Sequence, residues 1–257
     1  MNLAGKARCC DIPLHPEPLP MTDSTALDSF LDKWRTRWPE WRVVEVFVPE
    51  AQRPLALAWF ALLQEFTDAM NIAGDPLPAD AKLGWWGEEL RDWQRQRSRH
   101  PLGRLLEPHR APWFELAEAL PTLRRLREPP GTEAEVFEIA LPLAHAIAAV
   151  ERVLFPSPAA DSGSYELAAQ LLAARLEGGG ISALPLQSAN QHAFTQTDWT
   201  RRLLDHWPAR ATGPLPRRLA SALARSQLQR FKASGQPVAT LSPPRALWLA
   251  WRAARQA

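Results

Sequence analysis

One predicted helix carries a group of oxygen-bearing side chains that a metal ion or a phosphate group could use: Gln64, Glu65, Asp68 and Asn71. The apolar pattern from Leu55 to Met70 predicts this helix, and residues three or four positions apart are neighbours on its surface. The polar group therefore lies along one edge of an apolar stripe. Its two carboxylates could hold one Mg²⁺ ion weakly, because this hard cation binds oxygen ligands. The alternative interpretation is a solvated edge of an amphipathic helix, without chemistry.

A single carboxylate, Glu177, offers a second candidate position on another predicted helix, which begins near Tyr165 and also carries Gln170. The glycines Gly178 to Gly180 follow Glu177 directly. A glycine-rich loop binds phosphate when it follows a strand and opens a helix, whereas these glycines follow a helix. We therefore interpret them as the end of that helix.

Ser188, His192 and Asp198 are close in sequence but do not indicate a catalytic triad. No nucleophile elbow surrounds the serine, and a triad is defined by its geometry, not by proximity along the chain. The sequence therefore leaves the catalytic residues unknown.

A second helix follows the first after a short loop from Gly74 to Pro78. It contains the pattern K-L-x-W-W-x-x-E-L, from Lys82 to Leu90, and the pair His100-Pro101 comes after it. This combination resembles the squalene/phytoene synthase family, the head-to-head branch of the all-helical isoprenoid synthases. In that family the preceding helix reads roughly A-F-x-R-x-x-D-D-x-x-D.

The chain departs from the family at this aspartate motif. An ungapped alignment places Gln64 at the arginine and, along the aspartates, Thr67 at the first, Asp68 at the second and Asn71 at the last. A cluster that grips a diphosphate needs several carboxylates, because the metal must neutralise the charge that develops on the leaving group. Asp68, with Glu65 one turn earlier, supplies all the negative charge that is left on this helix.

The family's second acidic helix, Q-L-x-N-I-L-R-D-x-x-x-D, is reduced in the same way. Gln170 fits its opening and Leu184-Pro185 fits the segment that follows it. Between them, Ala173 stands at the asparagine, Glu177 at the first aspartate and Ile181 near the second. Each half of the metal site therefore retains about one carboxylate, and losses at two places that must cooperate argue against ionisation chemistry.

Composition supports an all-α protein of 257 residues, in which Ala, Leu and Arg dominate and no stretch alternates with period two for long. The 25 prolines predict many helices separated by sharp breaks. The resemblance implies an isoprenoid-synthase-like helical bundle around a central apolar cavity, with Gln64, Trp86 and Gln170 as cavity-lining candidates. We expect a disordered leader over residues 1–20 and a single helical domain over residues 21–257.

The predicted helices cover residues 25–38, 55–71, 79–99, 102–106, 112–126, 132–154, 165–177, 216–232 and 244–255. The valine-rich segment 41–48 has strand propensity but no partner strand, so we interpret it as an extended connector or a helix lead-in. The longest apolar run, Leu55 to Leu63, is about half of the roughly 18 residues that a membrane span requires. Any membrane contact is therefore expected to be peripheral.

Cys9 and Cys10 are adjacent and no secretory pattern precedes them. This arrangement excludes a disulfide framework and does not have the spacing of a zinc site. We therefore expect a reducing, cytoplasmic location, with peripheral membrane contact as an extension. Met21 precedes good helix-capping residues and is as good a translation start as Met1.

Positive charge is concentrated in the basic region 201–257. It contains 11 Lys and Arg residues and the single acid Asp205, an excess of 11 − 1 = +10, while the whole chain carries +2. Three interpretations compete: a solvated surface that packs against the acidic half, a patch for anionic lipid, and, least favoured because no motif for it is present, nucleic acid. Leu247, Leu249 and Trp251 are the candidate inner residues of the last helix.

The reduced acidic motifs favour a non-catalytic protein with the family's scaffold. Its predicted function is to bind a prenyl-type or other hydrophobic small molecule, or a protein partner, and no cofactor is expected. The alternative is an active Mg²⁺-dependent prenyltransferase of isoprenoid biosynthesis, which would condense prenyl diphosphates with Glu65, Asp68 and Glu177.

Overall fold

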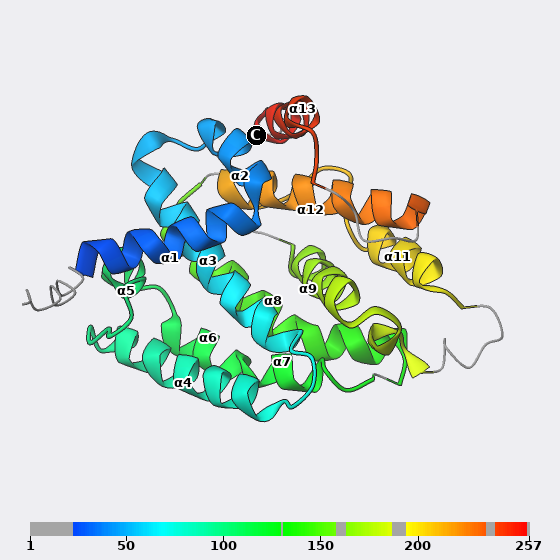
Figure 1. Ribbon diagram of the computed structural model, residues 1–257, viewed down its shortest axis with the longest axis horizontal. Coiled ribbons are helices and arrows are strands. Elements are labelled where there is room, and N and C mark those ends of the chain that lie inside the picture. The colour runs from blue at the N-terminus through cyan, green and yellow to red at the C-terminus, as the bar shows by residue number, and fades with distance from the viewer. Residues whose placement is uncertain (1–22, 130, 158–162, 187–193, 235–239, 256–257) are drawn as a thin grey trace, which may run out of the picture.

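The fold is built from helices joined by short turns (Figure 1). A computed structural model describes residues 23–129, 131–157, 163–186, 194–234 and 240–255, and these ranges contain no strand. The helices are α1 (Asp23–Arg37), α2 (Pro39–Val44), α3 (Arg53–Met70), α4 (Leu77–Gln94), α5 (Gly103–Leu106), α6 (Trp113–Ala119), α7 (Pro121–Arg125), α8 (Glu133–Leu154), α9 (Ser164–Gly179), α11 (Gln196–Asp205), α12 (Leu215–Ser234) and α13 (Pro243–Ala254). The predicted leader, Ser188 and His192 lie outside the described residues.

The α8 helix packs against α6, α7 and α9 and is buried along most of its length. It begins where the sequence predicts, because the Thr132 hydroxyl oxygen accepts a hydrogen bond from the Glu135 backbone N–H at 3.1 Å. A helix that is apolar on most sides belongs in the interior of a bundle. The buried residues of α8 join those of α3 and α9 in one continuous core.

The chain reverses between α3 and α4 at Gly74, whose φ of +84° lies in the left-handed region that favours glycine. The apolar stripe of α3 is buried, as its spacing predicts. On α4, Trp86 is 2% exposed and Trp85 is 38% exposed, because adjacent residues of a helix point in different directions. The double tryptophan therefore supplies the core with one ring only.

Three segments differ from their predicted form, and the first is α11 (Gln196–Asp205), a helix where none was predicted. Residues 112–126 form two helices, α6 and α7, because Pro121 lacks the backbone N–H that would continue the first of them. The valine-rich segment 41–48 is helical over most of its length, in α2 and in the 3₁₀ turn η1 (Glu45–Phe47), so a helix lead-in is the correct interpretation and an extended connector is wrong. Its backbone groups bond locally, as they must without a partner strand.

The last helix, α13, turns a different side inward from the one predicted. Leu247 and Trp251 are 42% and 46% exposed, and the buried residues are Ala246, Ala250 and Ala253. Leu249, the third predicted inner residue, is partly buried against the core. Small side chains allow α13 to lie close to α12 and α2, against which it packs. Within the described part of the chain, the helices are all too short or too polar to cross a bilayer.

Candidate functional site

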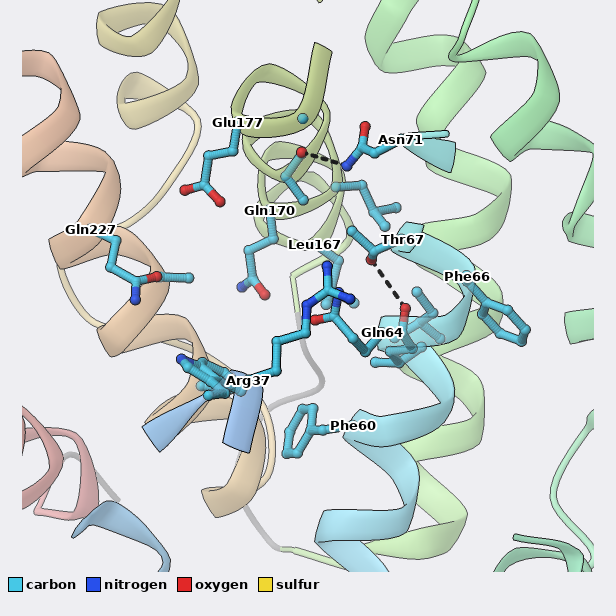
Figure 2. Close-up of a pocket in the computed structure, with 18 of the residues that line it drawn as sticks. Arg37, Phe60, Gln64, Phe66, Thr67, Asn71, Leu167, Gln170, Glu177 and Gln227 are labelled. Atoms are coloured by element: carbon cyan, nitrogen blue, oxygen red, sulfur yellow. Dashed lines mark hydrogen bonds between the residues drawn. The ribbon is translucent and has the colours of Figure 1, made fainter. Parts of the chain in front are cut away.

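A cavity of about 570 Å³ opens between α3, α9 and α12, and its size is typical of small-molecule sites (Figure 2). Most of its wall is apolar: Trp34, Trp38, Phe60, Leu63, Phe66, Leu143, Ile147, Leu167, Leu171, Ala174, Ala220 and Ala224. The other lining residues are polar or glycine: Arg37, Gln64, Thr67, Asn71, Gln170, Glu177, Gly178, Arg217 and Gln227. The two predicted motif helices, α3 and α9, thus face each other across this cavity.

The α3 wall presents a polar row to the cavity, formed by Gln64, Thr67 and Asn71. Steps of three and four residues keep this row on one side of the helix. Asp68 lies beside it with both oxygens engaged. One oxygen, Oδ2, accepts a hydrogen bond from Arg37 Nη1 at 2.6 Å, and Oδ1 accepts one from Gln64 Nε2 at 2.8 Å. The remaining carboxylate of the first motif is therefore neutralised by an arginine of α1.

Glu65 does not line the cavity. Its Oε2 lies 2.5 Å from Lys82 Nζ on α4, and its side chain is 13% exposed. Adjacent helical residues differ in direction by about 100°, which turns Glu65 away from the row that begins at Gln64. The structure therefore gives different partners to Glu65 and Asp68, which the sequence groups together.

The α9 wall presents Gln170, Ala174, Glu177 and Gly178 to the cavity. Steps of four residues from Gln170 lead to Ala174 and Gly178. Ala173, which the sequence comparison sets at the family's asparagine, is 5% exposed and packs in the core instead. Of the aligned motif positions on α9, Gln170 and Glu177 therefore face the cavity and Ala173 does not.

Asn71 joins the two walls. Its Nδ2 donates a hydrogen bond to the Ala174 carbonyl at 2.8 Å, and its Oδ1 lies 3.5 Å from Arg175 Nη1. A Cβ added to Gly178 would lie 2.3 Å from Asn71 Cγ. Glycine at 178 therefore provides the space that the asparagine side chain occupies, and any larger residue there would displace Asn71.

The Glu177 side chain extends into the cavity from α9 (Figure 2). Among the described residues, none makes a hydrogen bond or an ion pair with its carboxyl group. The surrounding protein partly desolvates this carboxyl group and so raises the pKa of Glu177, although the residue as a whole is exposed. Glu177 is thus a carboxyl group with no cation to balance its charge.

Arg217 of α12 brings a positive charge to the cavity from a buried network. Its Nε donates to both oxygens of Glu151, at 2.8 and 3.1 Å, and its Nη1 donates to Gln170 Oε1 at 3.0 Å. Trp59 Nε1 also donates to Glu151, at 2.8 Å, and the guanidinium lies 5.1 Å from the centre of the Phe60 ring. The carboxylate balances this arginine, so the pair adds polarity to the wall without net charge.

Sequence reasoning missed Arg37, Arg217 and Glu151. Arg37 and Asp68 are 31 positions apart, and Arg217 and Glu151 are 66 apart, so spacing along the chain gives no indication of either pair. One signal was available: Glu151 stands on a helix that is otherwise mostly apolar, and a buried carboxylate requires a cation or hydrogen-bond donors.

Trp86 is a core residue and does not line the cavity, which corrects the expectation from the sequence. Its ring centre lies 5.9 Å from that of Phe66, 6.3 Å from Trp93 and 4.8 Å from His100. Phe66 does line the cavity, so the aromatic lining residue here is Phe66 and not Trp86. Gln64 and Gln170 do line the cavity.

Glu89, the acid of the double-tryptophan pattern, is fully buried and holds the turn at His100. Its Oε1 accepts hydrogen bonds from Trp93 Nε1 at 2.9 Å and from the backbone N–H groups of Arg99 and His100 at 2.7 Å each, and Oε2 accepts one from Arg99 Nε at 3.1 Å. Burial opposes ionisation, but these hydrogen bonds outweigh it and lower the pKa of Glu89. The K-L-x-W-W-x-x-E-L pattern, the most recognisable one in the sequence, therefore contributes core residues beside the cavity and no lining residues.

Comparison with solved structures identifies the fold. The crystal structure of the squalene synthase HpnC from Alicyclobacillus acidocaldarius matches this chain with a TM-score of 0.53 and 17% sequence identity, over 93% of this chain and 96% of that one. The chain has a squalene-synthase-like fold. No family model and no curated protein sequence matches it. The predicted all-α, isoprenoid-synthase-like architecture is confirmed, and at this identity the likeness concerns the fold alone.

The resemblance in the sequence implies a magnesium and diphosphate site between α3 and α9, but the residues found there do not fit one. The described residues contain no group of three or more His, Cys, Asp or Glu side chains that could hold a metal ion. Asp68 is occupied by Arg37, and the cavity-facing positions around it, Thr67 and Asn71, are neutral. Magnesium needs several oxygen ligands at this place, and among the described residues of the two walls Glu177 is the one carboxyl group without a partner.

Proposed function

We propose that the cavity binds a hydrophobic, prenyl-type ligand and that the protein does not ionise prenyl diphosphates. The main support for this proposal is an uncharged hydrogen bond between the α3 and α9 walls. Asn71 donates to the Ala174 carbonyl and occupies the space beside Gly178. A metal–diphosphate cluster requires carboxylates from both walls at this place. Here the walls are joined directly, which supports binding without metal-assisted chemistry.

The charges of the cavity favour a ligand with a small, uncharged head. Asp68 balances Arg37 and Glu151 balances Arg217, while the Glu177 carboxyl has no cation among the described residues. A diphosphate would therefore meet no net positive charge. Glutamine side chains at the wall, Gln64, Gln170 and Gln227, can donate and accept hydrogen bonds with a hydroxyl group, and the apolar wall can bury a hydrocarbon chain.

The first experiment compares farnesol with farnesyl diphosphate, with and without Mg²⁺, by isothermal titration calorimetry. We expect farnesol to bind, with an affinity that Mg²⁺ does not change. Ala174→Phe and Ala224→Phe fill the cavity from two different helices and should weaken binding by roughly tenfold or more, since each ring takes the volume of several ligand carbons. Ala134→Phe, at an exposed position near the start of α8, is the matched control and should leave the affinity unchanged.

A second assay measures diphosphate release from farnesyl diphosphate in the presence of Mg²⁺, and we expect none above the buffer rate. Release that Asp68→Ala abolishes would establish the alternative, an active prenyltransferase. Failure of the wild-type protein to bind either compound would remove the ligand proposal itself.

A further inference from the structure

The outer face of α13 is apolar although it faces solvent. Leu247, Trp248 and Trp251 are 42%, 52% and 46% exposed. The side that α13 buries against α12 and α2 consists of the alanines Ala246, Ala250 and Ala253. A helix that packs on its own core normally buries its largest apolar residues, so this helix has its apolar side turned outward.

The apolar face continues beyond the helix itself. The 3₁₀ turn η1 packs against α13, and its Val46 is 56% exposed. We name Val46, Leu247, Trp248 and Trp251 together the α13 face. Large exposed apolar side chains that gather on one helix and on the turn packed against it mark a surface that another phase or molecule covers.

The charged residues of α13 itself are all positive, while the neighbouring turn η1 carries Glu45 beside Val46. Arg252 lies 4.7 Å from the centre of the Trp248 ring, and Arg255 lies 4.8 Å from that of Trp251. Arg245 is also exposed, and the segment from Pro243 to Ala254 contains no acidic residue. Each exposed indole thus carries a guanidinium beside it, and no acid on the helix neutralises these charges.

We infer that the α13 face docks on an anionic lipid surface. An interfacial helix buries tryptophan and leucine at the boundary between headgroups and acyl chains and sets arginine among the phosphates, and α13 has both groups on adjoining sides. A second copy of the chain fits less well, because a two-fold contact would bring like charges together without acids on α13 to pair with them. Single-stranded nucleic acid could use the tryptophans and arginines but gains nothing from Val46 and Leu247.

The test is co-sedimentation of the full chain with vesicles of phosphatidylcholine alone and of phosphatidylcholine mixed with phosphatidylglycerol. We expect binding to the mixed vesicles and weaker binding to the neutral ones. Replacing both tryptophans, in Trp248→Ser/Trp251→Ser, should lower partitioning by roughly tenfold or more on either vesicle. Arg252→Gln/Arg255→Gln should lower it on anionic vesicles alone, by about fivefold per arginine.

Phe114→Ser is the matched control, because Phe114 is 49% exposed on α6, away from the α13 face. It should partition like the wild-type protein, and the circular dichroism spectra of all variants should agree, because every replaced side chain is exposed. Binding to neither vesicle, or equal binding by the wild type and the tryptophan variant, overturns the inference. A concentration-dependent dimer in sedimentation velocity, lost in the tryptophan variant and without vesicle binding, assigns the α13 face to a second copy instead.

Discussion

The acidic residues of α3, α4 and α9 differ chiefly in what surrounds them. Glu89 accepts four hydrogen bonds in the core, whereas Asp68 and Glu65 are each paired with one cation. Glu177 has no such partner among the described residues. The residue type alone does not separate a structural carboxylate from one that is available to a ligand, because the partners come from other elements.

Glu89→Gln tests the structural role of the most highly bonded of these carboxylates. The amide cannot accept all four hydrogen bonds, so we expect the free energy of unfolding to fall by about 2 kcal/mol at pH 7. Because the fold lowers the pKa of Glu89 below its ordinary value of 4.5, the wild-type advantage is present above that value. It is lost as the pH falls through the lowered value, where the wild-type residue is protonated too. Urea denaturation across this range measures both effects.

Glu88→Gln is the control for this substitution, since Glu88 is the exposed neighbour on the same helix. It should change stability by less than about 0.5 kcal/mol at any pH. A Glu89→Gln deficit that stays constant from neutral to acidic pH would contradict the role assigned to the ionised carboxylate.

At the scale of elements, the pair Glu151–Arg217 joins α8 to α12 through the interior. Both residues are buried, at 1% and 6% exposed. A buried charge is costly to leave without its counterion, but replacing both charges by apolar groups is often nearly neutral. The contribution of the pair should therefore appear as a strong coupling between the two positions.

Glu151→Leu and Arg217→Met should each destabilise the protein by about 3 kcal/mol or more, because each leaves one buried charge without its partner. The double variant should be destabilised by less than the sum, with a coupling energy of about 2 kcal/mol in a double-mutant cycle. The exposed pair Asp32–Arg35, at 3.2 Å on α1, provides the control cycle, with a coupling below about 1 kcal/mol. Equal coupling in the two cycles would contradict a buried link between α8 and α12.

The sequence predicts most helices of this fold but not how each helix is turned. Periodicity places α3, α4, α8, α9 and α12 correctly, because each has an apolar stripe several turns long. It fails for α13, because the rule that large apolar residues face inward does not apply where Trp248 and Trp251 face outward. The sequence prediction also misses the helix break at Pro121. Proline is tolerated both in the first turn of a new helix and after the end of a helix, so its presence does not by itself locate the boundary.

At the scale of the whole molecule, the cavity is assembled from α1, α3, α8, α9 and α12. Gln64 and Gln170 could be assigned to it from the sequence because each stands on a motif helix. Arg37 and Arg217 could not, because their places depend on how distant helices pack, and helix packing is not encoded in local spacing. The family resemblance was sufficient to predict the architecture. The charges around the cavity could be assigned only from the structure.

Ligand binding in this cavity should stabilise the entire fold, because five helices contribute to its wall. A ligand present at about 100 times its Kd stabilises the native state by about 2.7 kcal/mol. For a domain of this size that corresponds to a rise in Tm of roughly 5–10 °C. Farnesol at that level should therefore raise the Tm of the wild type and of Ala134→Phe alike, measured by differential scanning calorimetry. Because Ala174→Phe should weaken binding by about tenfold or more, the same farnesol concentration should raise its Tm by at most about half as much. An equal rise in that variant would mean that farnesol binds elsewhere and that the cavity is not its site.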